Sequence, residues 1–124
     1  MEADTSSDPT TSLPPERVAE MLEAGGAQLI DVRTDFEWEA GHVAGARHIE
    51  IDEVSAHSDT IEKGEPVVFQ CRGGSRSEMV ASAFRESGWD AYNMEGGLQA
   101  WADRNLPLEP EDGRVEESRG LPGR

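Results

Sequence analysis

The chain has 124 residues, of which 35% are hydrophobic, and its formal net charge at pH 7 is −15. This length suits one domain with a modest core, and the excess of acidic groups argues against nucleic acid or an anionic membrane as a partner. No apolar run approaches the length of a membrane span, and one cysteine excludes an internal disulfide, so we expect a cytoplasmic protein with a reduced thiol.

The two ends of the chain differ in composition from its middle. Residues 1–12 are rich in Ser, Thr and Asp and lack an apolar period, and residues 109–124 combine prolines and glycines with charges of both signs. Such segments can bury little apolar surface. We therefore expect residues 1–12 to form a disordered N-terminal tail, residues 109–124 to form a flexible C-terminal tail, and residues 13–108 to form the globular domain.

The first part of the domain is predicted to form a helix, a strand and a second helix. Pro14 and Pro15 suit the first turn of a helix, and the glycines at 25–26 suit its end. Residues 28–32 form a short apolar run that is typical of a buried strand. Thr34 and Glu37 have the spacing of a capping box, which predicts a short helix directly after that strand.

The middle of the domain continues with further short elements. A glycine-rich turn over residues 41–46 leads to a predicted strand over residues 47–49, and the weak periodicity of residues 51–61 favours a short helix. Residues 67–69 are apolar and predict a second buried strand. Beyond it apolar residues recur every three or four positions, which predicts a helix with one apolar face formed by Met79, Val80, Ala83 and Phe84.

The last predicted elements are a strand over residues 91–94 and a helix that begins with residues 98–101. Strands and helices thus alternate, which is typical of an α/β fold with a small parallel sheet flanked by helices on both faces. In such folds ligands bind beyond the carboxyl ends of the strands. Asp31 and Arg33 end one predicted strand and Cys71 ends another, so we expect them to face the same crevice.

Cys71 stands between the second predicted buried strand and the helix that follows it. Unpaired N–H groups and the helix dipole favour an anion at this point, and Gly73 and Gly74 let successive N–H groups converge. Arg72 and Arg76 add positive charge. A thiol there should ionise more readily than a free cysteine, so we interpret Cys71 as a nucleophile in an anion cradle. The alternative is an inert core cysteine, which would need neither the glycines nor the arginines.

Other chemistry-bearing residues receive structural interpretations. The histidines show no metal-site spacing with the cysteine, so a structural or solvated role is expected for His42, His48 and His57. A solvated face is expected for the acidic residues Glu37, Glu39, Glu50, Asp52 and Glu53. Packing at the edges of the core is expected for Trp38, Trp89 and Trp101. Asp31 is expected to accept hydrogen bonds from loop N–H groups or from Arg33.

The sequence resembles the single-domain rhodaneses, a family of sulfurtransferases, and the resemblance covers roughly residues 13–106. Three blocks carry it, in the family's order: residues 31–33 with Glu37, Glu39 and residues 41–46; the active-site loop, residues 71–77; and residues 94–101. Glu50 stands where the family often has a proline after the third strand. This difference concerns a turn and not the residues of the loop.

The resemblance implies that the Cys71 thiolate takes a sulfane sulfur from thiosulfate or a persulfide and passes it to cyanide or a thiol, a protein thiol included. The cradle would consist of Arg72, Gly73, Gly74, Ser75, Arg76 and Ser77, supported by Asp31 and Arg33. Arg72 would meet the sulfonate of the donor, and Arg76 would shape and charge the cradle. No metal and no organic cofactor is needed.

Two other functions use similar residues. A cysteine-dependent phosphatase or arsenate reductase also combines a thiolate with an arginine, but such enzymes typically have one more residue between them than the four that separate Cys71 from Arg76. A non-catalytic rhodanese-type binding module would need no cysteine at the start of the loop. An assay of thiocyanate formation from thiosulfate and cyanide separates the three functions.

Overall fold

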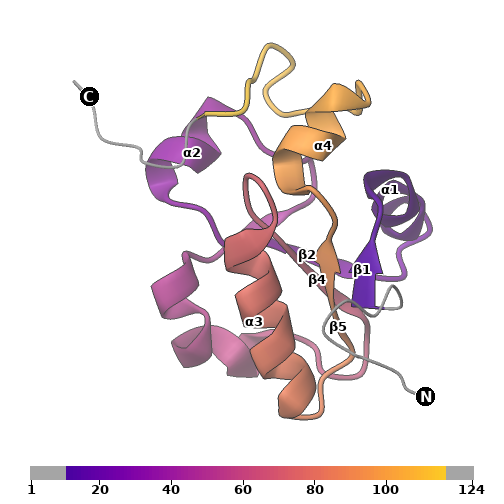
Figure 1. Cartoon of the computed structure of the whole chain (residues 1–124), viewed down its shortest axis with the longest axis vertical. Coiled ribbons are helices and arrows are strands. Elements are labelled where there is room, and N and C mark those ends of the chain that lie inside the picture. Colours follow the sequence, from indigo (N-terminus) through magenta and orange to yellow (C-terminus); the bar gives the residue numbers. More distant parts are fainter. Residues whose placement is uncertain (1–10, 117–124) are drawn as a thin grey trace.

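The computed structural model describes residues 11–116 of the chain. Five parallel strands form one sheet in the order β1-β5-β4-β2-β3 (Figure 1). Their bounds are β1 (Ser12–Leu13), β2 (Gln28–Asp31), β3 (Arg47–His48), β4 (Val67–Gln70) and β5 (Ala91–Met94). Because β4 is paired on both edges, its carboxyl end, which Cys71 follows, lies in the middle of the sheet.

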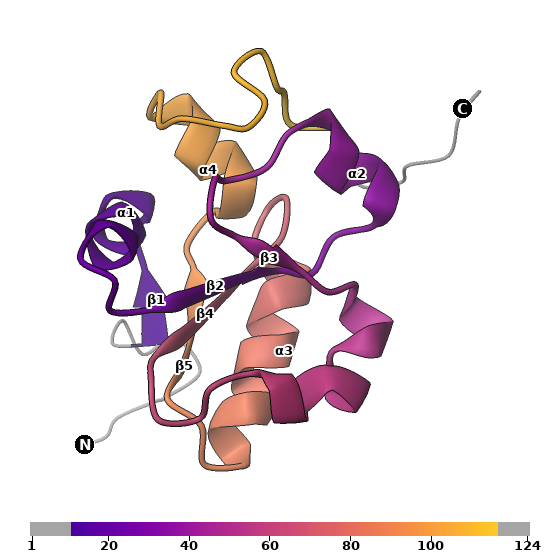
Figure 2. The ribbon, with the colours of Figure 1, turned by 180° about the vertical axis from the view of Figure 1, so that it is seen from behind.

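Four α-helices connect and cover the strands: α1 (Pro15–Glu23), α2 (Asp35–Ala40), α3 (Ser75–Glu86) and α4 (Gly97–Asp103). Figures 1 and 2 show α3 on one face of the sheet and α1 on the other. Where the sequence predicts one short helix over residues 51–61, the chain instead forms two short 3₁₀ helices, η2 (Ile51–Glu53) and η3 (Ser55–Thr60). The predicted α/β fold with a small parallel sheet is confirmed.

Two apolar clusters lie on the two faces of the sheet. Side chains alternate along a strand, so Val67 and Phe69 of β4 belong to one cluster and Val68 belongs to the other. Ala81 of α3 closes the first cluster, and Val18 of α1 closes the second together with residues of α4. Burial on both faces explains why β4 reads as an unbroken apolar run in the sequence.

The folded chain continues past residue 108, where the composition predicts the start of a flexible tail. His42 exchanges two backbone hydrogen bonds (2.9 and 2.6 Å) with the first residue of the segment 109–116, here called the C-terminal strap, and the Arg114 amide donates to the Ala40 carbonyl at 2.8 Å. A Cβ atom on Gly41 would lie 2.6 Å from the Arg114 nitrogen. The backbone of the strap, within the segment expected to form a flexible tail, thus bonds to the end of α2.

At the other end, β1 begins at Ser12, one residue before the expected start of the domain, and pairs with β5 at two positions. The rest of the two expected tails, residues 1–10 and 117–124, lies outside the described residues. Within residues 11–116, none of the helices combines the length and the apolar character that crossing a lipid bilayer requires.

Candidate active site

Cys71 directly follows β4 and is almost completely buried, with 1% of its surface exposed. Its Sγ atom accepts hydrogen bonds from the amide of Gly74 (3.1 Å) and from the amide of Ser77 (3.4 Å). These amides lie at the N-cap and in the first turn of α3, where N–H groups have no partner within the helix. The sulfur thus lies where the backbone and the helix dipole favour negative charge.

Two glycines determine the shape of the loop around this sulfur. Gly74 has a φ of 107°, in the left-handed region that side-chain-bearing residues rarely adopt. Gly97, at the start of α4, lies against the loop backbone, and a Cβ atom on it would come within 2.5 Å of the Arg72 carbonyl oxygen. The amide of Leu98 donates to the carbonyl of Cys71 at 2.8 Å. The start of α4 therefore holds the loop backbone in addition to the contacts from α3.

Ser77 connects the sulfur to a buried polar residue of β5. Its Oγ atom lies 2.6 Å from Oδ1 of Asn93 and 3.4 Å from Sγ of Cys71. A hydroxyl has one proton to donate, and the shorter contact is the stronger hydrogen bond. Asn93 thereby fixes the orientation of the Ser77 side chain, and the backbone amides remain the principal donors to the sulfur.

Arg76 forms a bidentate ion pair with Glu37 of α2. Nη1 lies 3.0 Å from Oε1 and Nη2 lies 3.0 Å from Oε2, and the Glu37 side chain is fully buried. Oε1 of Glu37 also accepts from the amide and the hydroxyl of Thr34, which completes the predicted capping box. The Glu37 carboxylate therefore takes part in capping the N-terminus of α2 and also binds Arg76 of the Cys71 loop.

This pairing corrects the expectation that Glu37 lies on a solvated acidic face. Burial by itself raises the pKa of Glu37, but the hydrogen bonds from Arg76 and Thr34 and the charge of Arg76 outweigh it and hold the pKa below its ordinary value of 4.5. The hydrogen bonds to Glu37 in turn raise the pKa of Arg76. Because Glu37 neutralises Arg76, this arginine gives the cradle less positive charge than the sequence predicts.

Asp31 and Arg33 form a second, fully buried ion pair. Nη2 of Arg33 lies 2.7 Å from Oδ2 of Asp31, and Nε lies 2.9 Å from Oδ1. Other guanidinium N–H groups of Arg33 donate to the carbonyls of Glu37 (3.2 Å) and Gly41 (2.9 Å). The pair binds the last turn of α2 and its C-cap, so it positions the helix that carries Glu37.

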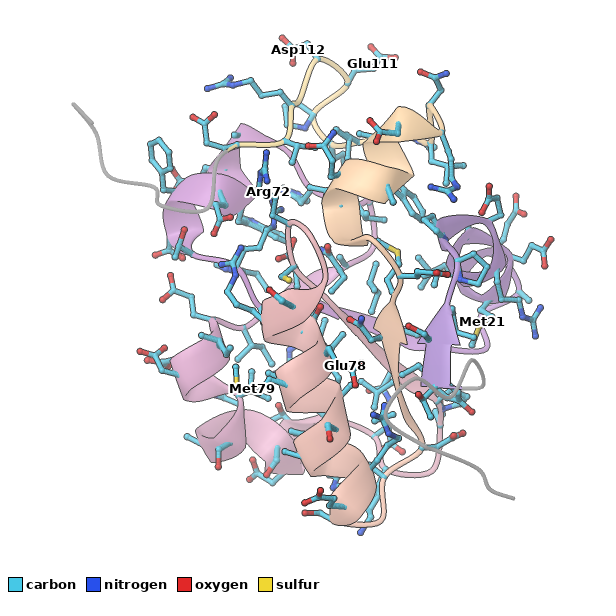
Figure 3. All side chains as sticks on the ribbon, viewed as in Figure 1. Met21, Arg72, Glu78, Met79, Glu111 and Asp112 are labelled. Carbon is cyan, nitrogen blue, oxygen red and sulfur yellow. The ribbon has the colours of Figure 1, made fainter. Side chains whose placement is uncertain are left out.

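Arg72 has no ion pair with any described residue. Its Nε atom is buried and lacks a hydrogen-bond partner within residues 11–116, and Figure 3 shows its side chain rising from the loop, between α2 and α4 in that view. Gln70, two positions earlier, is fully buried, and its amide group also has no partner there. Arg72 is therefore the positive group of the loop that is available to an anion.

The structure brings some predicted cradle residues to the sulfur and leaves others outside. Gly74 and Ser77 bond to it directly, whereas Gly73 and Ser75 are exposed and have no hydrogen bond to Sγ. Asn93 was not among the predicted site residues. A signal for it exists, because a polar residue at an inward position of a buried strand requires a partner.

The chain matches the sequence model of a family described as Rhodanese-like domain over residues 14–104. It is 31% identical over 111 residues to the thiosulfate sulfurtransferase GlpE of Pseudomonas aeruginosa, and the alignment covers 89% of this chain and 99% of that protein. It is 37% identical over 79 residues to the uncharacterized protein YqhL of Bacillus subtilis, which covers 63% of either protein. The chain therefore spans less than two thirds of that second relative.

Solved structures give a similar result. The rhodanese-like domain protein from Staphylococcus aureus superposes with a TM-score of 0.70 at 30% sequence identity, covering 86% of this chain and 99% of that one. The C-terminal strap lies beyond the residues that the family model matches.

Proposed function

Because this chain belongs to the rhodanese-like domain family, we propose that it is a sulfurtransferase in which Cys71 carries the transferred sulfur atom. The observation that carries this proposal is the setting of Sγ, which accepts hydrogen bonds from the amides of Gly74 and Ser77 at the start of α3. These donors stabilise a sulfur anion. Since Cys71 is the only cysteine in the sequence, one thiolate must both accept and release the transferred atom.

In the first half-reaction, the Cys71 thiolate attacks the outer sulfur of thiosulfate. A new S–S bond forms while the S–S bond of thiosulfate breaks, and sulfite leaves with the electron pair of the broken bond. The product is a persulfide on Cys71, whose terminal sulfur bears the negative charge. A persulfide donor reacts in the same way, with a thiolate as the leaving group.

In the second half-reaction, cyanide or a thiolate attacks the terminal sulfur of the persulfide. The S–S bond breaks, its electron pair returns to Cys71, and the products are the free thiolate and thiocyanate or a new persulfide. Atoms and charge balance without an oxidant, a metal or an organic cofactor. Two half-reactions on one covalent intermediate give ping-pong kinetics.

The arginines have different roles in this proposal. Arg72, which has no ion pair with a described residue, attracts the sulfonate end of the donor. Arg76 is already paired with Glu37 and holds the shape of the loop. The donors and acceptors are small molecules or protein thiols, and the proposal places the reaction in the cytoplasm, where thiols remain reduced.

The first prediction tests the covalent intermediate. Thiosulfate without an acceptor should add one sulfur atom to the full chain, visible by intact-mass spectrometry, and cyanide should then remove it with formation of thiocyanate. The Cys71→Ser chain should show neither the added mass nor turnover, because a serine hydroxyl cannot form the S–S bond. Ordinary turnover by Cys71→Ser would refute the proposal.

Phosphate chemistry is the competing function, because it also uses a thiolate and an arginine. Two observations weigh against it. Four residues separate Cys71 from Arg76, which leaves a ring of N–H groups better suited to one sulfur atom than to a tetrahedral phosphate. Both terminal nitrogens of Arg76 also bond to Glu37, so fewer of its N–H groups remain for phosphate oxygens.

A further inference from the structure

A pocket beside the edge strand β3 gathers polar groups that the sulfur-transfer site does not use. Its volume is about 450 Å³, and it is lined by Asp35, Arg47, His48, Ile49, Glu50, Glu53 and His57. Figure 2 shows the chain passing from β3 through a short connection into the 3₁₀ helices. One potential ligand atom from each of Asp35, His48 and Glu50 lies within 4.8 Å of the other two. We propose that these three side chains bind a divalent transition-metal ion, best represented by Zn²⁺.

The tautomer of His48 is the first support for this site. Its Nε2 atom lies 2.7 Å from the carbonyl oxygen of Arg33. A carbonyl only accepts hydrogen bonds, so Nε2 carries a proton, and in the neutral ring the lone pair is on Nδ1. The ring also stacks on Trp38, with centroids 4.8 Å apart. A histidine that donates one N–H to a carbonyl and is held by packing has the usual arrangement of a metal ligand.

The direction of that lone pair is the second support. Nδ1 of His48 lies 3.5 Å from Oδ1 of Asp35. A proton on the ring or a metal ion can bridge two such atoms, and the 3.5 Å separation matches the metal case, because ligands of tetrahedral zinc lie ~3.4 Å apart when each bond is ~2.1 Å. Glu50 accepts the amide of Asp35 through Oε2 at 2.8 Å, which leaves Oε1 as the third ligand.

Charge in the pocket also favours a cation. Arg47 donates to the Thr60 carbonyl at 3.0 Å, and no described lysine or arginine forms an ion pair with Asp35 or Glu50. One imidazole nitrogen with two carboxylate oxygens suits zinc and its neighbours, whereas Mg²⁺ prefers oxygen ligands alone. The spacing in the sequence gives no metal signal, because the start of α2 and the end of β3 meet only in the fold.

Calorimetric titration with zinc chloride tests the site on the full-length chain without a tag. The Cys71→Ser chain serves as the parent, so that thiol binding does not contribute, and it should bind one Zn²⁺ per chain. Asp35→Asn, His48→Ala and Glu50→Gln should each weaken zinc binding about tenfold or more, since even loss of a ligand's outer partner costs that much. An equal concentration of Mg²⁺ should not displace the zinc.

Two matched controls come from the same pocket. His57→Ala and Glu53→Gln remove the same chemical groups from residues outside the proposed ligand set, and zinc affinity should stay at the parent value. Asp35 is exposed, so the Asn variant should fold, and circular dichroism checks this. Absence of saturable binding by the Cys71→Ser chain would overturn the proposal. So would an unchanged affinity in Asp35→Asn, or an equal loss in the two controls, which would indicate diffuse attraction by acidic groups.

Discussion

At the scale of single residues, Glu37 links the start of a helix to the catalytic loop. Its carboxylate accepts from the amide and the hydroxyl of Thr34 and from both terminal nitrogens of Arg76. Removing one partner of a buried ion pair leaves the other charge without compensation, which costs more than the pair itself contributes. The charge of Glu37 should therefore matter for folding as well as for the loop.

Glu37→Gln removes this charge and keeps the capping box, because glutamine also serves at that position. At pH 7 we expect the free energy of unfolding to fall by about 3 kcal/mol, the lower end for buried pairs, since 26% of the Arg76 side chain is exposed. The folded pKa of Glu37 is depressed, so its contribution is complete above the ordinary value of 4.5 and is lost as the pH falls through the folded pKa.

Urea unfolding of both chains at a series of pH values measures this difference. The difference in the free energy of unfolding between wild type and Glu37→Gln should become smaller as the pH falls below 4.5. Glu39→Gln, an exposed site on the same helix, is the matched control and should show almost no gap at any pH. A gap of constant size down to acid pH would mean that the Glu37 charge is not the cause.

Arg72→Ala tests the assignment of the sulfonate. Loss of the unpaired guanidinium should raise KM for thiosulfate about tenfold or more, as expected for a lost charge-assisted hydrogen bond. A persulfide donor should be used almost as well as before, because it has no sulfonate to bind. Steady-state kinetics measure the KM for each donor in the variant and in the wild type. Arg17→Ala, at an exposed position of α1, is the control. Equal impairment with both donors would disprove this role.

Local chemistry explains which site residues the sequence predicts. Cys71, Gly74 and Ser77 lie within seven consecutive positions, so a strand, a glycine pair and a helix start suffice to place them. The partner of Arg76 is 39 positions away on α2, and no local pattern connects the two. Asn93 likewise reaches Ser77 only because β4 and β5 pair in the sheet.

At the scale of elements, the Cys71 loop is held between two helix starts. The amides of α3 point at the sulfur, and the amide of Leu98 in α4 bonds to the Cys71 carbonyl. Gly97 allows the two backbones to approach closely. The size of the ring of N–H groups is therefore set by the number of residues in the loop.

Insertion of one glycine between Gly74 and Ser75 tests this dependence on ring size. A larger ring should hold a single sulfur atom poorly, so sulfur transfer should fall by about tenfold or more. The unmodified chain should transfer sulfur and hydrolyse aryl phosphates negligibly, whereas the insertion should open the ring to weak phosphate or arsenate chemistry. Thiocyanate formation and aryl phosphate hydrolysis are the two measurements.

A matched glycine insertion in the exposed turn beside Gly64 controls for chain lengthening, since it lies away from the loop. It should leave both activities unchanged. Efficient phosphatase activity in the unmodified chain, without sulfur transfer, would replace the proposed function with the competing one.

Most elements follow from local patterns, and the exceptions have physical reasons. The predicted helices and strands form close to their expected bounds because periodicity, capping and glycines act over a few residues. β1 has two residues, too few to show alternation, and its pairing with β5 alone defines it. Residues 51–61 show weak periodicity, and there the chain forms 3₁₀ helices in place of one helix.

At the scale of the whole molecule, the C-terminal strap extends the folded unit. A chain that ends at residue 108 loses three backbone hydrogen bonds to His42 and Ala40 that a chain ending at residue 116 retains. At about 1 kcal/mol each, we expect the shorter chain to be less stable by about 3 kcal/mol. Thermal and urea unfolding of the two truncated chains measure the difference.

Gly41→Ala gives an independent check of the same packing. In the chain that ends at residue 116, the added Cβ meets the backbone of Arg114, so the substitution should destabilise. The chain that ends at residue 108 lacks this backbone. There the substitution should change the free energy of unfolding very little. Equal costs in the two chains would show that the strap does not pack on Gly41. Composition could not predict this contact, because it joins backbone to backbone.

The pairing of Glu37 with Arg76 also affects how the gene for this chain can change over generations. A charge reversal at one position alone would place two like charges where oppositely charged atoms now lie 3.0 Å apart, with one partner fully buried. Descendants should keep both residues or replace both together, since the single-step intermediate folds poorly. The codons of Glu37 and Arg76, 39 positions apart, should therefore be conserved or exchanged as a pair.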